Sequence, residues 1–437
     1  MGFKITAAGD AMMLADFPGD GYLRDEICSF IQTGDARLIN VEMVLSNGNC
    51  YASTYCGGQW ICSNPKHLDD LKTYGFNMFG CANNHSMDYS YEGLLETKYY
   101  FEDKGIPYAG IGKDLEEASD PCYFSASDEH GNQIKVAMVS FTTTFIDAAR
   151  AGESNHFFKG RPGINAVRSK TVYYISEEDM IVLKSIAAKT YINGERDNAR
   201  KIGSLPPEDE NCLNFGGAFF EVGNIPGKST QTDSRDEKRI LNTIKASCKQ
   251  ADYVIVLGHS HQIKHTSYTE PDYFVEDLYR KCIDAGASCV IGSGTHQMKP
   301  IEIYHGKPIF YSLGNFIFQT HLVDKLPSDF WDKYQFKKEL SLKDALEKKF
   351  HGGKVGLIVD RNNYISCIPL IEFEGDVITQ IVLKPIELCF DGPELMKGLP
   401  RAASMEIGKQ LQIYLQDISS CYGTKLYMEG DLIKIEL

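Results

Sequence analysis

The stretch Gly75-Phe76-Asn77-Met78-Phe79-Gly80-Cys81-Ala82-Asn83-Asn84-His85-Ser86-Met87-Asp88 passes from a largely apolar segment into a polar one. Residues 75–81 are predicted to form a short buried strand, and the polar cluster begins where that strand ends. The side-chain oxygen of Asn84 can ligate a metal ion. Asp88 follows His85 by three residues and can hold its imidazole in one tautomer. The stretch therefore predicts a strand end that carries groups suited to metal binding and proton transfer.

Apolar strands followed by side chains of the metal-ligand type recur along the chain. The other such ends are Gly9-Asp10 after a strand over 4–8, Asn40-Val41-Glu42 at the end of 36–41, Gly258-His259-Ser260-His261 after 251–257, and Gly292-Ser293-Gly294-Thr295-His296 after 287–291. Helices are predicted over 65–74 and 91–104. Strands that alternate with helices indicate an α/β fold, in which ligands bind at the carboxyl ends of the strands. We therefore expect these clusters to converge on one edge of one sheet.

The types of side chain in these clusters indicate the metal. Strand alternation places Asn40 and Glu42 on the same side of their strand, and it gives His259 and His261 a common side as well. Carboxylate, amide and imidazole ligands suit Mn, Zn, Fe or Mg better than a thiolate site would. A shared site for divalent metal ions is predicted.

Composition excludes some classes of partner. The chain has 437 residues and a formal net charge of −14. Nucleic-acid binding depends on Lys and Arg that neutralise phosphates, and anionic membranes also attract basic surfaces, so neither partner is expected. No window approaches the roughly 20 apolar residues of a membrane span, and no signal peptide is visible at the start. The 13 scattered cysteines then fit reduced thiols in a cytoplasmic protein.

The rest of the chain predicts one domain with additions. Further strands are expected over 134–141 and 309–313, a charged helix over 336–350, β-like alternation over 354–391, and a helix over 405–420 before a hairpin around Gly430. Residues 145–245 are polar, are expected to be rich in loops, and carry a basic patch (Lys159, Arg161, Arg168 and Lys170). We expect a single domain over 1–437, with a polar insertion at about 145–245 and a C-terminal extension from about 350.

Together these motifs resemble the CapA family of poly-γ-glutamate capsule-synthesis proteins, a bacterial branch of the calcineurin-like metallophosphoesterases. The similar segments are 9–13, 40–42, 57–61, 82–90, 110–118, 161–168, 259–261, 292–302 and 311–318. The last of them, Tyr311-Ser312-Leu313-Gly314-Asn315-Phe316-Ile317-Phe318, is highly specific. The resemblance runs nearly from end to end of the chain.

The resemblance implies a four-layer α/β/β/α sandwich of two mixed sheets flanked by helices, with two divalent metal ions between the sheets. The ligands that carry over are Asp10, Glu42, Asn84, His259 and His296. His85 is then the acid near the leaving group, and Asp88 is its orienting partner.

The chain departs from the family pattern in its histidine half. Ser260 replaces a family Trp, and Ser293 and Gly294 replace two family His residues. His261, absent from the family pattern, completes a Gly-His-Ser-His segment like the one in ordinary phosphoesterases. Either His261 replaces the missing ligand or one metal position is weakened, so the number of ions stays open.

The functional expectation is a metal-dependent hydrolase that acts on a phosphoester through a metal-activated water, or that serves poly-γ-glutamate or capsule metabolism. Its partner would be an anionic small molecule or polymer, and the resemblance assigns Arg161, Asn165 and Arg168 to substrate binding. A guanidinium fork fits phosphate and carboxylate equally well. Two alternatives stay open: a non-catalytic binding or assembly factor for an anionic polymer, and a γ-glutamyl amide hydrolase.

Overall fold

Two β-sheets packed face to face form the body of the computed structural model, which describes residues 2–17, 25–127, 131–207, 209 and 211–437. The first sheet contains β1 (Gly2–Met12), β2 (Ala36–Val41), β5 (Met78–Gly80), β6 (Tyr108–Ala109), β19 (Asn315–Phe318), β20 (Ile365–Glu374), β21 (Val377–Glu387), β22 (Arg401–Ala402), β23 (Leu426–Glu429) and β24 (Leu432–Ile435). The second contains β8 (Cys122–Ser127), β9 (Gln133–Thr142), β15 (Tyr253–Ser260), β16 (Cys289–Gly294), β17 (Ile301–Tyr304) and β18 (Lys307–Phe310).

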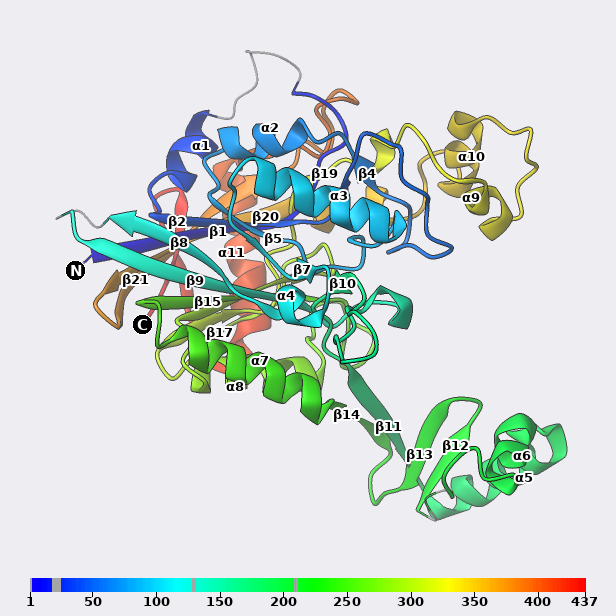
Figure 1. Cartoon of the computed structure of the whole chain (residues 1–437). Helices are drawn as coiled ribbons and strands as arrows, with labels where there is room; N and C mark the ends of the chain where they lie inside the picture. The colour runs from blue at the N-terminus through cyan, green and yellow to red at the C-terminus, as the bar shows by residue number, and fades with distance from the viewer. Residues whose placement is uncertain (1, 18–24, 128–130, 208, 210) are drawn as a thin grey trace.

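Helices cover the outer face of each sheet. In Figure 1, α1 (Asp25–Ile31), α2 (His67–Thr73) and α3 (Ser90–Asp103) lie on the first sheet, and α7 (Ser234–Ser247) and α8 (Tyr273–Asp284) lie on the second. Each sheet contains both parallel and antiparallel pairs, such as β1 with β2 and β1 with β20 in the first sheet. The expected α/β/β/α sandwich of two mixed sheets is confirmed.

Three apolar cores hold these layers together. The core between the sheets joins Ile5 and Leu38 of the first sheet to Ile255 and Ile291 of the second. A second core packs the first sheet against α1, α2 and α3, and a third packs the second sheet against α7 and α8. Because the central strands are buried on both faces, they read in the sequence as near-continuous apolar runs.

Smaller elements join the body. Short pairs form between β3 (Val44–Leu45) and β4 (Cys62–Ser63), and between β7 (Ile111–Gly112) and β10 (Gly163–Ile164). The helix α4 (Leu115–Ser119) precedes β8, and α11 (Met405–Ser419) contacts β21 and β23. No helix in the described part of the chain combines the length and the apolar character that crossing a bilayer requires.

The stretch 145–245, expected to be rich in loops, instead has regular structure, and that expectation is wrong. Its strands β11 (Ser169–Ile175), β12 (Cys212–Phe215), β13 (Ala218–Val222) and β14 (Gly227–Thr232) form a separate sheet with α5 (Glu177–Thr190) and α6 (Gly194–Lys201). Figure 1 shows this arm projecting from the body, below and to the right. The strand β14 and the helix α6 are polar throughout, which makes this part of the chain resemble loops in composition. The number of domains stays a prediction.

The charged stretch after residue 320 forms two short helices in place of the one expected over 336–350. They are α9 (Ser328–Lys333) and α10 (Leu342–Lys349). Ser341 caps α10, because its hydroxyl oxygen accepts a hydrogen bond from the backbone N–H of Asp344 at 3.2 Å. Phe330 and Ala345 anchor the two helices in a small core with Trp60 and Tyr89.

A close approach of two strands positions Asp10. The backbone N–H of Asp10 donates to the carbonyl oxygen of Gly314 at 2.9 Å, where β1 meets the segment before β19. A Cβ atom on Gly9 would lie 1.9 Å from that same oxygen. Only glycine at position 9 therefore permits this contact.

We expect Gly9→Ala to lower the free energy of unfolding by about 2–3 kcal/mol, because the added methyl group must push the two strands apart. Chemical denaturation of the purified variant measures this. Gly227→Ala is the matched control: a Cβ there meets no atom within 4 Å, so the change should stay within about 0.5 kcal/mol. Equal stability of Gly9→Ala and the unmodified protein would contradict the argument.

Candidate metal centre

The predicted clusters meet between the two sheets. Asp10 of β1 pairs in register with Asn40 of β2, and His259 of β15 pairs with Ser293 of β16. The first pair belongs to the first sheet and the second pair to the second sheet. The clusters therefore converge as expected, but from two facing sheets and not along one.

Glu42 lies at the centre of this cluster. Its side chain is fully buried, and neither carboxylate oxygen has a hydrogen-bond partner among the described residues. Two imidazole nitrogens lie close to it: His259 Nε2 is 3.5 Å from Oε1, and His296 Nδ1 is 3.9 Å from Oε2. Burial, reinforced by Asp10 and Asp88, raises the pKa of Glu42 well above its ordinary value. A buried carboxylate without donors is a group that a divalent cation satisfies, so the residues present fit a metal.

The other side chains gather their ligand atoms around Glu42. Two triads, Glu42–His259–His261 and Asp10–Glu42–His296, each have ligand atoms within 4.8 Å of one another. His259 Nε2 lies 2.6 Å from the side-chain oxygen of Asn84 and 3.1 Å from His261 Nε2. All six predicted metal ligands thus come together.

The charge state of these groups also suits a cation. Burial lowers the pKa of His261 well below its ordinary value and that of His296 to about 4. Both imidazoles are therefore neutral near pH 7, the form that ligates metals. Burial opposes ionisation of Asp10, but His259 and His296 hold its pKa below the ordinary value.

Polar side chains around the cluster fix the ligands. Asn40 donates to Asp10 Oδ1 at 2.6 Å, and the backbone N–H of Gly294 donates to Asp10 Oδ2 at 2.9 Å. The hydroxyl of Ser293 lies 3.0 Å from His259 Nδ1 and so fixes the orientation of that ring. Ser293, expected from the family pattern only as the replacement of a ligand, therefore has a supporting role that the sequence does not reveal.

Asn315 supports His296, which has a left-handed backbone conformation with φ of 62°. The side-chain oxygen of Asn315 lies 2.9 Å from His296 Nδ1, and the side-chain NH2 of Asn315 donates to the carbonyl oxygen of Asn363 at 2.9 Å. Asn315 belongs to the highly specific segment 311–318. That segment was the signal that could have identified it as a site residue.

His85 and Asp88 form a buried pair beside the cluster. His85 Nδ1 lies 2.7 Å from Asp88 Oδ2. Backbone N–H groups of Gly57 and Ile61 donate to the two oxygens of Asp88 at 2.9 and 2.8 Å. The carboxylate is thereby held in place, and it fixes Nδ1 as the bonded nitrogen, which leaves Nε2 to act on a substrate.

A cavity of about 340 Å³ opens next to these groups. His85, His261 and His296 line it. Much of the remaining lining is apolar or aromatic and includes Phe318 and Tyr334. A small anionic substrate could therefore reach both the candidate metal ligands and the candidate acid.

The three residues predicted to bind substrate are not brought to this cavity. Arg168 donates to both oxygens of Asp236, at 2.6 and 2.9 Å, and Arg161 donates to the carbonyl oxygen of Arg150 at 3.1 Å. Asn165 is fully buried and donates to the carbonyl oxygen of Ser140 at 2.9 Å. Their contacts hold the chain together, and none of the three lines the cavity.

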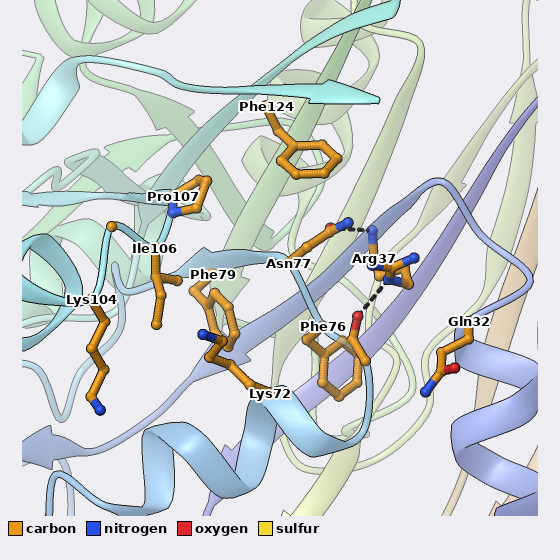
Figure 2. Close-up of a pocket in the computed structure, with 12 residues that line it drawn as sticks. Gln32, Arg37, Lys72, Phe76, Asn77, Phe79, Lys104, Ile106, Pro107 and Phe124 are labelled. Atoms are coloured by element: carbon orange, nitrogen blue, oxygen red, sulfur yellow. Dashed lines mark hydrogen bonds between the residues drawn. The ribbon is translucent and has the colours of Figure 1, made fainter. Parts of the chain in front are cut away.

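A second cavity, of about 500 Å³, lies at the opposite end of the first sheet, beside the start of β2 and β5. Figure 2 shows Arg37 bonded to Asn77 and to the backbone carbonyl oxygen of Gly75. The described residues that line it include no His, Asp, Glu or Cys. The side chains that could bind a metal or transfer a proton therefore lie at the other end of the sheet.

One further group, Asp16, His67 and Asp70, also has ligand atoms within 4.8 Å of one another. Both ring nitrogens of His67 are already engaged, by Ser63 Oγ at 2.7 Å and by Asp16 Oδ1 at 2.9 Å. Asp16 is largely exposed to solvent. We do not assign a metal to this group.

This chain is similar to several known proteins. The family model for bacterial capsule synthesis protein PGA_cap matches residues 4–320. "Uncharacterized protein y4sH" of Sinorhizobium fredii is 29% identical over 100% of this chain and 93% of its own length. "PGA biosynthesis protein CapA" of Bacillus subtilis is 24% identical over 59% of this chain and 46% of its own. The calcineurin-like phosphoesterase YfkN of Bacillus subtilis aligns with 92% of this chain and 88% of its own, at 14% identity and a TM-score of 0.34.

We predict that Mn²⁺ binding to the metal-stripped protein releases protons from Glu42. Its raised pKa means that the metal-free protein retains a proton at a pH where a free carboxyl group has lost it, and a cation displaces that proton. Affinity should therefore rise with pH until the pH exceeds the pKa of Glu42. Calorimetry in two buffers of different ionisation enthalpy measures the release.

Glu42→Gln should lose most of this proton release and weaken Mn²⁺ binding by about 100-fold. Glu270→Gln is the control, because Glu270 is a part-exposed carboxylate paired with His265 outside the cluster. Proton release that is the same in Glu42→Gln and in the unmodified protein would show that another group supplies the proton.

Proposed function

Because the chain belongs to the bacterial capsule synthesis protein PGA_cap family, we propose that it is a metal-dependent hydrolase of an anionic substrate, in the first instance a phosphoester. The observation that carries this proposal is the buried carboxyl group of Glu42. It has no hydrogen-bond partner among the described residues and is shared by two triads of potential ligands. A pair of triads with one member in common supports a site for two divalent ions.

In this proposal Asp10, Glu42, Asn84, His259, His261 and His296 hold the ions. Bound divalent ions supply Lewis acidity and an activated water at neutral pH. The protein fixes the orientation of its ligands through Asn40, Ser293 and Asn315. It buries Asp10, Glu42, His259 and His296.

His85 is proposed as the general acid. Asp88 fixes its ring through Nδ1, so that Nε2 faces the cavity and can give a proton to the departing oxygen. The backbone bonds from Gly57 and Ile61 keep Asp88 in one orientation, so that Nδ1 stays hydrogen-bonded to it while Nε2 gives up and regains its proton.

The substrate is proposed to be a phosphoester, or a component of poly-γ-glutamate or capsule metabolism. Two similar proteins are called "PGA biosynthesis protein CapA" and "Capsule biosynthesis protein CapA". Hydrolysis of a γ-glutamyl amide would use the same water and the same acid, so its products must be tested separately. A binding role without catalysis is less well supported, because Ser293 orients His259 where a degraded site would leave that ring unsupported.

The decisive experiment combines metal analysis with activity. We expect the purified protein to bind Mn²⁺ and to hydrolyse para-nitrophenyl phosphate, and Asp10→Asn to lower kcat/KM by about 100-fold or more. Failure to bind any divalent ion would overturn the proposal. Release of free glutamate from poly-γ-glutamate, without phosphatase activity, would assign the amide hydrolase instead.

His85→Gln should slow the hydrolysis of phenyl phosphate more than that of para-nitrophenyl phosphate. Phenolate is the more basic leaving group, so its departure depends more on protonation by an acid. We expect a loss of about 100-fold or more in kcat for phenyl phosphate and a clearly smaller loss for the nitro compound. Steady-state kinetics on the two esters give the ratio. His265→Gln is the control, since His265 is exposed and pairs with Glu270. An equal loss on both esters would show that His85 does not protonate the leaving group.

A further inference from the structure

The segment that carries α9 and α10 walls the cavity of the metal centre. The lining residues from this part of the chain are Thr320, Tyr334, Lys349, Phe350, Gly356, Leu357 and Ile358. All of them except Thr320 lie beyond the residues that the family model matches, which end at 320. Figure 1 shows α9 and α10 beside the body, next to β4 and α3. The metal ligands and this part of the cavity lining therefore come from different parts of the chain.

Lys349 is the cation of this wall. Its ammonium group donates to Gln59 Oε1 at 2.5 Å and lies over the rings of Phe350 and Tyr334, at 4.7 and 5.3 Å from their centroids. No Asp or Glu lines the cavity within the described residues, and none of those residues places a carboxylate within 4.0 Å of Lys349. Burial and the nearby Lys333 lower its pKa to about 8, so the group still carries its charge at pH 7.

A buried ammonium group without a carboxylate partner can be compensated by a bound ligand that supplies the negative charge. In a protein whose formal net charge is −14, acidic side chains are plentiful, yet among the described residues none lines this cavity. The aromatic and apolar neighbours lower the local dielectric, which strengthens attraction to an anion that enters. His85, the proposed acid, lines the same cavity, so the leaving-group side of the substrate faces this wall.

We propose that Lys349 binds a second anionic group on the leaving-group side of the substrate, while Tyr334, Phe350 and Leu357 pack against the apolar part that joins it to the reacting phosphoryl group. The inference rests on the proposed function. It names the substrate class as a phosphoester whose leaving group carries a carboxylate or a further phosphate.

A purely structural role for Lys349 makes a different prediction. Gln59, its hydrogen-bond partner, lies in the same loop as Gly57 and Ile61, which hold Asp88. If the role were only structural, loss of Lys349 would disturb His85 through this loop and would weaken the binding of every ligand by the same factor. Selectivity between ligands with and without the second anion separates the two roles.

The experiment measures binding of phosphonates that cannot be hydrolysed to the Mn²⁺-loaded protein by calorimetry. Phenylphosphonate is compared with para-phosphonobenzoate and with its longer homologue, para-phosphonophenylacetate. We expect at least one carboxylate-bearing ligand to bind about tenfold more tightly than phenylphosphonate, Lys349→Gln to abolish that preference, and Lys349→Arg to keep most of it. Lys348→Gln removes the same charge from the exposed side of α10 and should change nothing.

Two outcomes would overturn the proposal: absence of a preference for both carboxylate-bearing ligands, or an equal loss of affinity for all three phosphonates in Lys349→Gln. Because binding needs no turnover, a protein that shows the preference but hydrolyses no phosphoester would contradict the proposed reaction and leave this inference intact. A protein that hydrolyses phenyl phosphate but shows no preference for the carboxylate-bearing ligands would support the proposed reaction and contradict the role of Lys349.

Discussion

The buried carboxylate of Glu42 is the constraint around which the site is built. A carboxyl group buried without hydrogen-bond donors costs free energy in either charge state, and its raised pKa keeps Glu42 protonated until a cation compensates the charge. Here two sheets bring three imidazoles, a second carboxylate and an amide oxygen toward it, and none of them donates a hydrogen bond to its oxygens. The metal-free fold therefore stores a cost in stability, which a divalent cation removes on binding.

Much of this arrangement can be predicted from the sequence, because strand ends are local features. An apolar run followed by Asp10, His85 or His259 marks a carboxyl end, and an α/β fold brings carboxyl ends together. That inference identified all six candidate ligands and the His85–Asp88 pair. It did not show that the ligands come from two facing sheets, since no local pattern tells which strands share a sheet.

Other features depend on partners far away in the chain. Arg168 fits an anion holder in the sequence, but its fork is occupied by Asp236, which no spacing rule connects to it. Ser293 looked like a lost ligand and instead orients His259. Lys349 lies in a charged helix whose composition is that of a solvated surface, and only tertiary packing turns it toward the cavity. Long-range pairing of polar groups decides these roles, and hydrophobic periodicity carries no information about it.

The loop over 57–61 links parts of the molecule that are otherwise separate. It receives Lys333 and Lys349 from the helical segment on one side, and on the other it holds Asp88 and accepts a hydrogen bond from Asn84. Its contacts thus join the candidate metal centre to the part of the cavity lining that lies beyond the residues matched by the family model. Exchange of the α9–α10 segment between relatives would alter which molecules are accepted while the ligand set stays untouched, so that selectivity in such a fold can evolve as a module.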